Sequence, residues 1–67
     1  MKIYLGDSLV EISDKTTLQE FVDAQNLKSL NGVAVAINDV VIAKTKWADK
    51  LFSEEDKVII IKATAGG

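Results

Sequence analysis

Alternation of apolar and polar residues opens the chain and predicts a strand. The first six residues, MKIYLG, place isoleucine and leucine on one side and lysine and tyrosine on the other, which is the pattern of a half-buried strand. A GDS turn signal at residues 6–8 and the short run LVEIS follow. Together these segments predict an N-terminal β-hairpin.

The period changes to that of a helix in the segment TTLQEFVDAQNL. Leu18, Phe21 and Val22 share one helical face, and the threonine and glutamate of TLQE match a capping box. We expect a helix from Leu18 to about Lys28, because the Asn-Gly pair at residues 31–32 then interrupts the pattern.

Three apolar runs predict strands in the second half of the chain. VAVAIN and VVIAK meet at an Asn-Asp pair, which predicts a hairpin, and VIIIKAT is the last strand. Between them lies a loop with a charged surface turn, SEEDK, and with three residues that we expect to be buried, namely Trp47, Leu51 and Phe52. The resulting order β-β-α-β-β-β predicts an α+β domain in which one helix covers one sheet.

The strands VAVAI and VIII are apolar at consecutive positions, so both of their faces are apolar. If the side of Ile3 meets the helix, Val58 and Ile60 point inward. Ile59 and Ile61 then point outward, where one helix cannot cover them. Two interpretations stay open: the outward residues form a partner surface, or the loop around the tryptophan shields them.

Composition limits the chemistry that the chain can perform. The 67 residues are 48% hydrophobic and 27% charged, with a net charge of −2, no cysteine and no histidine. The best metal ligands and the usual general base are therefore missing. Scattered lysines argue against nucleic acid as a partner, and no apolar run approaches the roughly 20 residues that span a bilayer. We expect a cytoplasmic protein; carboxylates such as Asp39 and Asp49 are typical of solvated turns rather than of a catalytic site.

The sequence ends in KATAGG, whose residues become smaller towards the terminus. We expect a single domain at residues 1–64 and a flexible tail at residues 65–67, since glycine is costly to order. Residues without a Cβ atom can pass through a narrow channel, and the carbonyl carbon of Gly67 is unhindered. The tail is thereby suited to chemistry that another enzyme performs on its carboxylate. A frayed end or a cloning remnant is the alternative.

The order and spacing of these segments resemble the β-grasp (ubiquitin-like) fold and, within it, the ThiS-type sulfur-carrier family of thiamin biosynthesis. The resemblance rests on a small-aliphatic strand ending at Asn38, a segment with Trp47, the charged turn 53–57, the aliphatic strand 58–61 and the glycines 66–67. It implies a mixed sheet of four to five strands. The family's usual Gly-Asp before the last strand is Glu-Asp here, which we interpret as a conservative change in a surface turn.

The resemblance also implies a protein cosubstrate, not an enzyme. An E1-like, ThiF-type adenylyltransferase would use ATP and magnesium to adenylate Gly67. A sulfur donor such as a cysteine desulfurase persulfide would then produce a thiocarboxylate, and a ThiG-type thiazole synthase would accept the sulfur. The chain itself would bind no cofactor and no metal.

In this interpretation Gly66 and Ala65 thread the tail into the partner. The implied docking residues are Ile59, Ile61, Glu54, Glu55 and Asp56. Three alternatives stay open: a molybdopterin-type sulfur carrier, a ubiquitin-like protein modifier, and a small interaction domain with an inert tail. The related molybdopterin carrier typically has prolines before its glycines, and this chain has no proline, which favours the thiamin branch.

Overall fold

The computed structural model describes residues 1–27 and 31–62. Its elements follow the expected order along the chain: β1 (Lys2–Leu5), β2 (Ser8–Glu11), α1 (Leu18–Asp23), β3 (Val33–Ile37), β4 (Val40–Ile42), the 3-10 helix η1 (Lys44–Lys46) and β5 (Lys57–Lys62). The strands form one sheet in the order β2-β1-β5-β3-β4. β1 and β5 are parallel and the other neighbours are antiparallel, so the expected mixed α+β sheet is confirmed.

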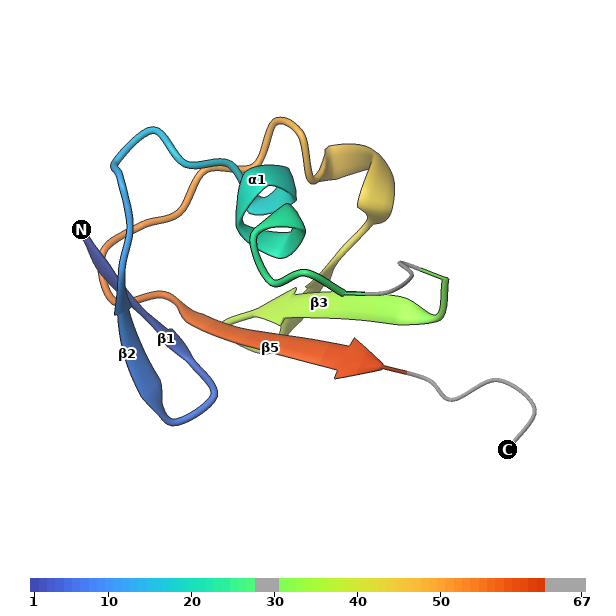
Figure 1. The fold of residues 1–67 in the computed structure, drawn as a ribbon, viewed down its shortest axis with the longest axis horizontal. Coiled ribbons are helices and arrows are strands. Elements are labelled where there is room, and N and C mark those ends of the chain that lie inside the picture. The colour runs from blue at the N-terminus through green and yellow to red at the C-terminus, as the bar shows by residue number, and fades with distance from the viewer. Residues whose placement is uncertain (28–30, 63–67) are drawn as a thin grey trace.

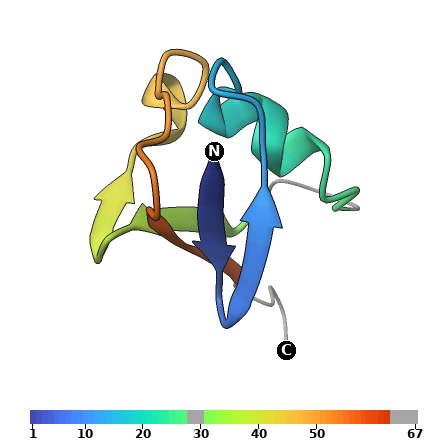
Figure 2. The same cartoon turned by 90° about the vertical axis from the view of Figure 1, so that its left-hand side faces the viewer.

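The helix and η1 lie on the same side of the sheet (Figures 1 and 2). The core between them and the sheet consists of Ile3, Leu18, Phe21, Val22, Val33, Val35, Ile37, Trp47, Phe52 and Val58. The Trp47 indole N–H donates a hydrogen bond of 2.9 Å to the carbonyl oxygen of Ile42. Since Trp47 packs on the helix side, the interpretation that its loop shields the second face of the sheet is wrong.

The N-terminus of α1 carries the predicted capping box. The Glu20 amide donates to the Thr17 hydroxyl at 3.2 Å, and the Thr17 amide donates to the Glu20 carboxylate at 3.0 Å. Two backbone donors that the helix cannot satisfy itself are satisfied in this way. The capping residues are those that the sequence pattern indicated.

The helix is shorter than predicted, because it ends at Asp23 and not near Lys28, which lies outside the described residues. The amides of Gln25 and Asn26 donate to carbonyls three residues earlier, which is the tighter spacing common at helix ends. Asn26 then adopts the left-handed region at φ 56°. Asparagine is among the few residues that end a helix in this conformation.

The two hairpin turns form where the sequence places them. Gly6 has φ 59° between β1 and β2. Asn38 and Asp39 have φ 52° and 70° between β3 and β4. Two consecutive left-handed residues match the right-handed twist of the strands that they join. Both turns are therefore two-residue connections that fix the register of their hairpins.

One of the three loop residues expected to be buried is exposed. Leu51 is 51% exposed, whereas Trp47 and Phe52 are buried. Leu51 forms an isolated bridge with Thr17, and in such an extended segment neighbouring side chains point to opposite sides. The Phe52 ring therefore points inward and packs edge-on against Phe21 at 5.5 Å. No helix within residues 1–27 and 31–62 has the length and apolar character to cross a bilayer.

Candidate functional site

The last strand is the part of the structure that leads to the C-terminus. β5 lies in the middle of the sheet between β1 and β3, and the description ends at its last residue, Lys62. The candidate residues Ala65, Gly66 and Gly67 lie outside the described residues. Their roles stay predictions, and the described site consists of the surfaces around β5.

Side chains of β5 alternate as the sequence predicts. Val58 is fully buried and Ile60 is half-buried, and both belong to or pack against the core. Ile59 and Ile61 are 47% and 48% exposed. The predicted inward and outward directions are confirmed.

The neighbouring strands add side chains to the side of the sheet on which the outward residues of β5 lie. Ile59 pairs with Ala36, which pairs with Val41, and Ile61 pairs with Ala34. The same side of β1 and β2 carries one more pair, because alternation from the buried Ile3 directs Tyr4 outward opposite Leu9. We call this set the outer apolar face: Tyr4, Leu9, Ala34, Ala36, Val41, Ile59 and Ile61. The helix and η1 lie on the opposite side (Figure 1). The exposed members of the face are Leu9, Val41, Ile59 and Ile61, whereas Ala36 is 7% exposed. Exposed apolar side chains gathered on one face are typical of a partner site.

Sequence reasoning missed Leu9 and Val41 as members of this surface. They are 55% and 65% exposed, more than the two isoleucines that were predicted. The signal was present in the two-residue turns: counting outward from Asn38-Asp39 pairs residue 41 with residue 36. The outer apolar face thus covers both hairpins and the central strand.

The acidic turn before β5 is only partly the exposed surface that we expected. Glu54 and Glu55 are exposed, but Asp56 is 7% exposed. Its carboxylate accepts hydrogen bonds of 2.9 Å from the Asn38 amide group and 2.7 Å from the Ser53 backbone. The prediction that Asp56 contacts a partner is therefore wrong, because its acceptors are turned into the protein.

Asp56 and Asn38 instead hold the beginning of β5. The Asn38 side-chain oxygen accepts from the Lys57 amide at 3.0 Å, and the Asn38 amide donates to the Lys57 carbonyl at 2.8 Å. On the other side, the Tyr4 amide donates to the Asp56 carbonyl at 2.8 Å. The start of the strand is attached to the β3–β4 turn and to β1 at once, which fixes the direction in which β5 leads.

The glutamate that replaces the family's usual glycine has an unfavourable backbone conformation. Glu55 has φ 66°, a region that costs a residue with a Cβ atom about 1–2 kcal/mol. Its amide donates at 2.7 Å to the carbonyl of Lys2. The interpretation of this difference as conservative is therefore wrong, since the position requires the conformation that glycine adopts freely.

No cluster of three or more His, Cys, Asp or Glu side chains suited to a metal ion occurs in residues 1–27 and 31–62. The described part of the site consists of a central strand, an apolar surface beside it and two exposed carboxylates. This arrangement can present a C-terminus and bind a partner.

The sheet order, the single helix and the central C-terminal strand define a small β-grasp domain. The model of the ThiS family matches residues 2–67, so the chain belongs to the ThiS family. It is 24% identical over 67 residues to the sulfur carrier protein ThiS of Escherichia coli (strain K12), with 100% of both chains covered.

A solved structure shows the same fold. The crystal structure of the thiamine biosynthesis protein ThiS from Geobacter metallireducens covers 100% of both chains with a TM-score of 0.83 and 16% sequence identity. The expected β-grasp fold is thereby confirmed.

Proposed function

We propose that this protein is a sulfur carrier for the thiazole part of thiamin and works in the cytoplasm. The observation that carries the proposal is the match of the ThiS family over residues 2–67, which includes the two terminal glycines. The curated relative, which is similar along its whole length, is a sulfur carrier protein. In this proposal the reacting group is the carboxylate of Gly67, and the chain is a cosubstrate of other enzymes.

A carboxylate must be activated before sulfur can replace its oxygen. A ThiF-type adenylyltransferase would join the Gly67 carboxylate to the α-phosphate of ATP, with magnesium, and release pyrophosphate. The terminal sulfur of a persulfide then attacks the carbonyl carbon. The bond between this carbon and the phosphate oxygen breaks, and AMP is released. A thiol cleaves the resulting S–S bond to give the thiocarboxylate and a disulfide. A ThiG-type thiazole synthase accepts the sulfur.

The length of the tail restricts where the partner docks. Gly67 follows Lys62 by five positions, and five residues span at most about 17 Å when fully extended. The adenylating site must therefore come within this distance of the end of β5. Ile59 and Ile61, on the outer apolar face, are close enough to be the docking residues, with Glu54 and Glu55 at the rim, where charges mainly change the association rate.

Intact mass spectrometry tests the chemistry directly. We expect the protein, incubated with ATP, magnesium, the adenylating enzyme and a persulfide donor, to gain the mass of one oxygen-to-sulfur exchange. Deletion of Gly67, or addition of one alanine after it, should abolish the change while circular dichroism stays that of the native fold. Conversion of the extended protein would refute the proposed role of Gly67.

The same experiment separates the other functions. A ubiquitin-like modifier would give a ladder of larger adducts on lysines, and a molybdopterin-type carrier would form a thiocarboxylate that a thiazole synthase does not consume. An interaction domain with an inert tail would bind its partner unchanged after removal of residues 66–67.

Docking through the outer apolar face has a matched control. Ile59→Asp should weaken binding of the adenylating enzyme about tenfold or more, because it places a charge in a desolvated contact. Leu51→Asp should stay within about twofold, since Leu51 is equally exposed but lies outside the outer apolar face. Equal affinities of the two variants would exclude this face as the docking surface.

A further inference from the structure

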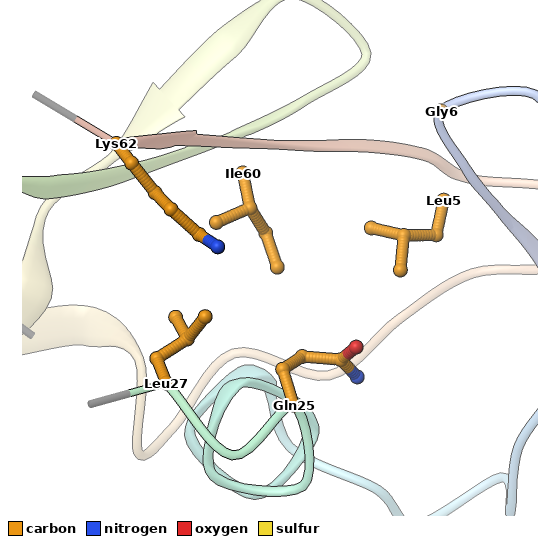
Figure 3. A pocket seen from close by; sticks show the side chains of 6 residues that line it. All are labelled: Leu5, Gly6, Gln25, Leu27, Ile60 and Lys62. Carbon is orange, nitrogen blue, oxygen red and sulfur yellow. The ribbon is translucent and has the colours of Figure 1, made fainter. Parts of the chain in front are cut away.

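A groove opens between the sheet and the end of the helix, on the side opposite the outer apolar face. It has a volume of about 380 Å³ and is lined by Leu5, Gly6, Gln25, Leu27, Ile60 and Lys62. Figure 3 shows Leu5, Ile60 and Lys62 pointing from the strands towards Gln25 and Leu27, which lie in the segment that follows the helix. The volume is at the lower end of the range of about 300–1,000 Å³ that is typical of ligand sites.

The groove exists because α1 is short. The helix ends at Asp23, and Ile60 of β5 stays half-buried. Leu5, Leu27 and Ile60 pack against the core, which makes the floor of the groove a continuation of the core. A large apolar side chain placed there would complete the packing.

The rim of the groove is positively charged. The Lys62 side chain extends over the opening, and its nitrogen lies towards the space between Ile60 and Leu27 (Figure 3). Among the described residues no carboxylate forms an ion pair with this ammonium group. Gln25 donates from its side chain to the Phe21 carbonyl at 3.1 Å, which fixes the amide at the edge. An apolar floor beside a cation complements an apolar side chain next to a carboxylate.

We propose that this groove binds a segment of the adenylating partner in which a large apolar residue adjoins an aspartate or glutamate. The inference rests on the proposed function, because that function requires a partner within about 17 Å of Lys62, and Lys62 itself lines the groove. The partner then contacts both faces of β5. Contact on both faces fixes the direction of the strand, and so of the tail, more firmly than contact on one face.

Two variants and a matched control test the groove. Lys62→Glu reverses the charge at the rim, and Lys15→Glu makes the same change at an exposed lysine in the loop between β2 and α1. Leu27→Ala shortens the apolar wall. Affinity for the adenylating enzyme is measured by calorimetry at two salt concentrations. In parallel, the methyl signals of Leu5, Leu27 and Ile60 are followed by NMR, and the Gly67 adenylate by intact mass.

We expect Lys62→Glu and Leu27→Ala to weaken binding about tenfold and Lys15→Glu to stay within about twofold. The loss in Lys62→Glu should decrease at high salt, and the groove methyl signals should shift in the complex. Equal affinities of Lys62→Glu and Lys15→Glu, or groove signals that stay unchanged in the complex, would overturn the proposal. If Leu27→Ala is unfolded, the comparison of Lys62→Glu with Lys15→Glu still tests the proposal.

Other occupants give distinct results. Groove signals that shift with protein concentration alone indicate a second copy, and signals that shift when residues 63–67 are removed indicate the chain's own tail; either overturns the proposal. If the wild-type protein forms no adenylate, the proposed function fails. The affinities of the variants for the same enzyme then still show whether the groove is a binding site.

Discussion

Asp56→Asn should destabilise the protein although the two side chains have nearly the same shape. The carboxylate of Asp56 accepts from two donors, the Asn38 amide group and the Ser53 backbone. An asparagine has one oxygen and one NH₂ group, so in either orientation two donors would face each other. Asn38 cannot rotate to compensate, because its oxygen accepts from the Lys57 amide.

The size of the effect follows from the burial of the carboxylate. Asp56 is 7% exposed, and a hydrogen bond to a charged group contributes about 1.5–3 kcal/mol. We expect Asp56→Asn to lose about 2 kcal/mol and Asp56→Ala about 3 kcal/mol of the free energy of unfolding. A domain of this length has roughly 3–10 kcal/mol in total, so either loss is easily measured.

Urea denaturation followed by the fluorescence of Trp47 measures these losses, since this single tryptophan is buried in the core. Asp49→Asn serves as the control, because Asp49 is exposed and should change stability by less than about 0.5 kcal/mol. The reciprocal double variant Asn38→Asp with Asp56→Asn is the sharpest test. In the double variant the carboxylate at position 38 accepts from the Lys57 amide and from the new side-chain amide at position 56. This variant should recover at least about 1 kcal/mol of the lost free energy of unfolding.

A double variant whose loss equals the sum of its two single losses would refute this reasoning. So would an Asp56→Asn protein as stable as Asp49→Asn. In both cases the start of β5 would be held by its backbone pairing and not by the side chains of Asn38 and Asp56.

Four further variants test the fold. Thr17→Ala should cost about 1 kcal/mol, because it removes the hydroxyl that caps α1; an unchanged melting temperature by circular dichroism would contradict the role of the cap. Glu55→Gly should stabilise by about 0.5–1 kcal/mol, since glycine relieves the left-handed backbone but is more flexible when unfolded; a loss in urea titrations would argue against this account. Phe52→Ala should cost about 3–5 kcal/mol and Leu51→Ala less than about 0.5 kcal/mol; similar midpoints for the two would show that their burial has been assigned wrongly.

Local patterns were sufficient to predict the elements that local chemistry determines. The capping box at Thr17, the Asn38-Asp39 turn and the alternation along β5 each depend on a few neighbouring residues, and each is present in the structure. The end of α1 could not be predicted, because the apolar spacing continues to Leu27. The hydrogen bonds of the Gln25 and Asn26 amides and the left-handed conformation of Asn26 show that the helix ends earlier.

Properties that depend on distant contacts were less accessible. An acidic residue in SEEDK is normally solvated, and the burial of Asp56 results from Asn38, which is distant in sequence. Glu55 combines a left-handed conformation with a hydrogen bond to Lys2, a residue distant in sequence. Leu51 and Phe52 are equally hydrophobic, so composition alone could not decide which points inward. The groove at Lys62 depends on where the helix stops, which the sequence pattern misplaced.

The central position of β5 has a consequence for the timing of recognition. β5 is the last strand along the chain, yet it joins the β1–β2 hairpin to the β3–β4 hairpin, and such long-range pairing forms late because of its loop-closure entropy. A polypeptide on the ribosome that still lacks β5 has two separate hairpins and only fragments of the outer apolar face. A partner that binds only the whole surface would therefore distinguish a chain whose β5 is paired from one that still lacks this strand.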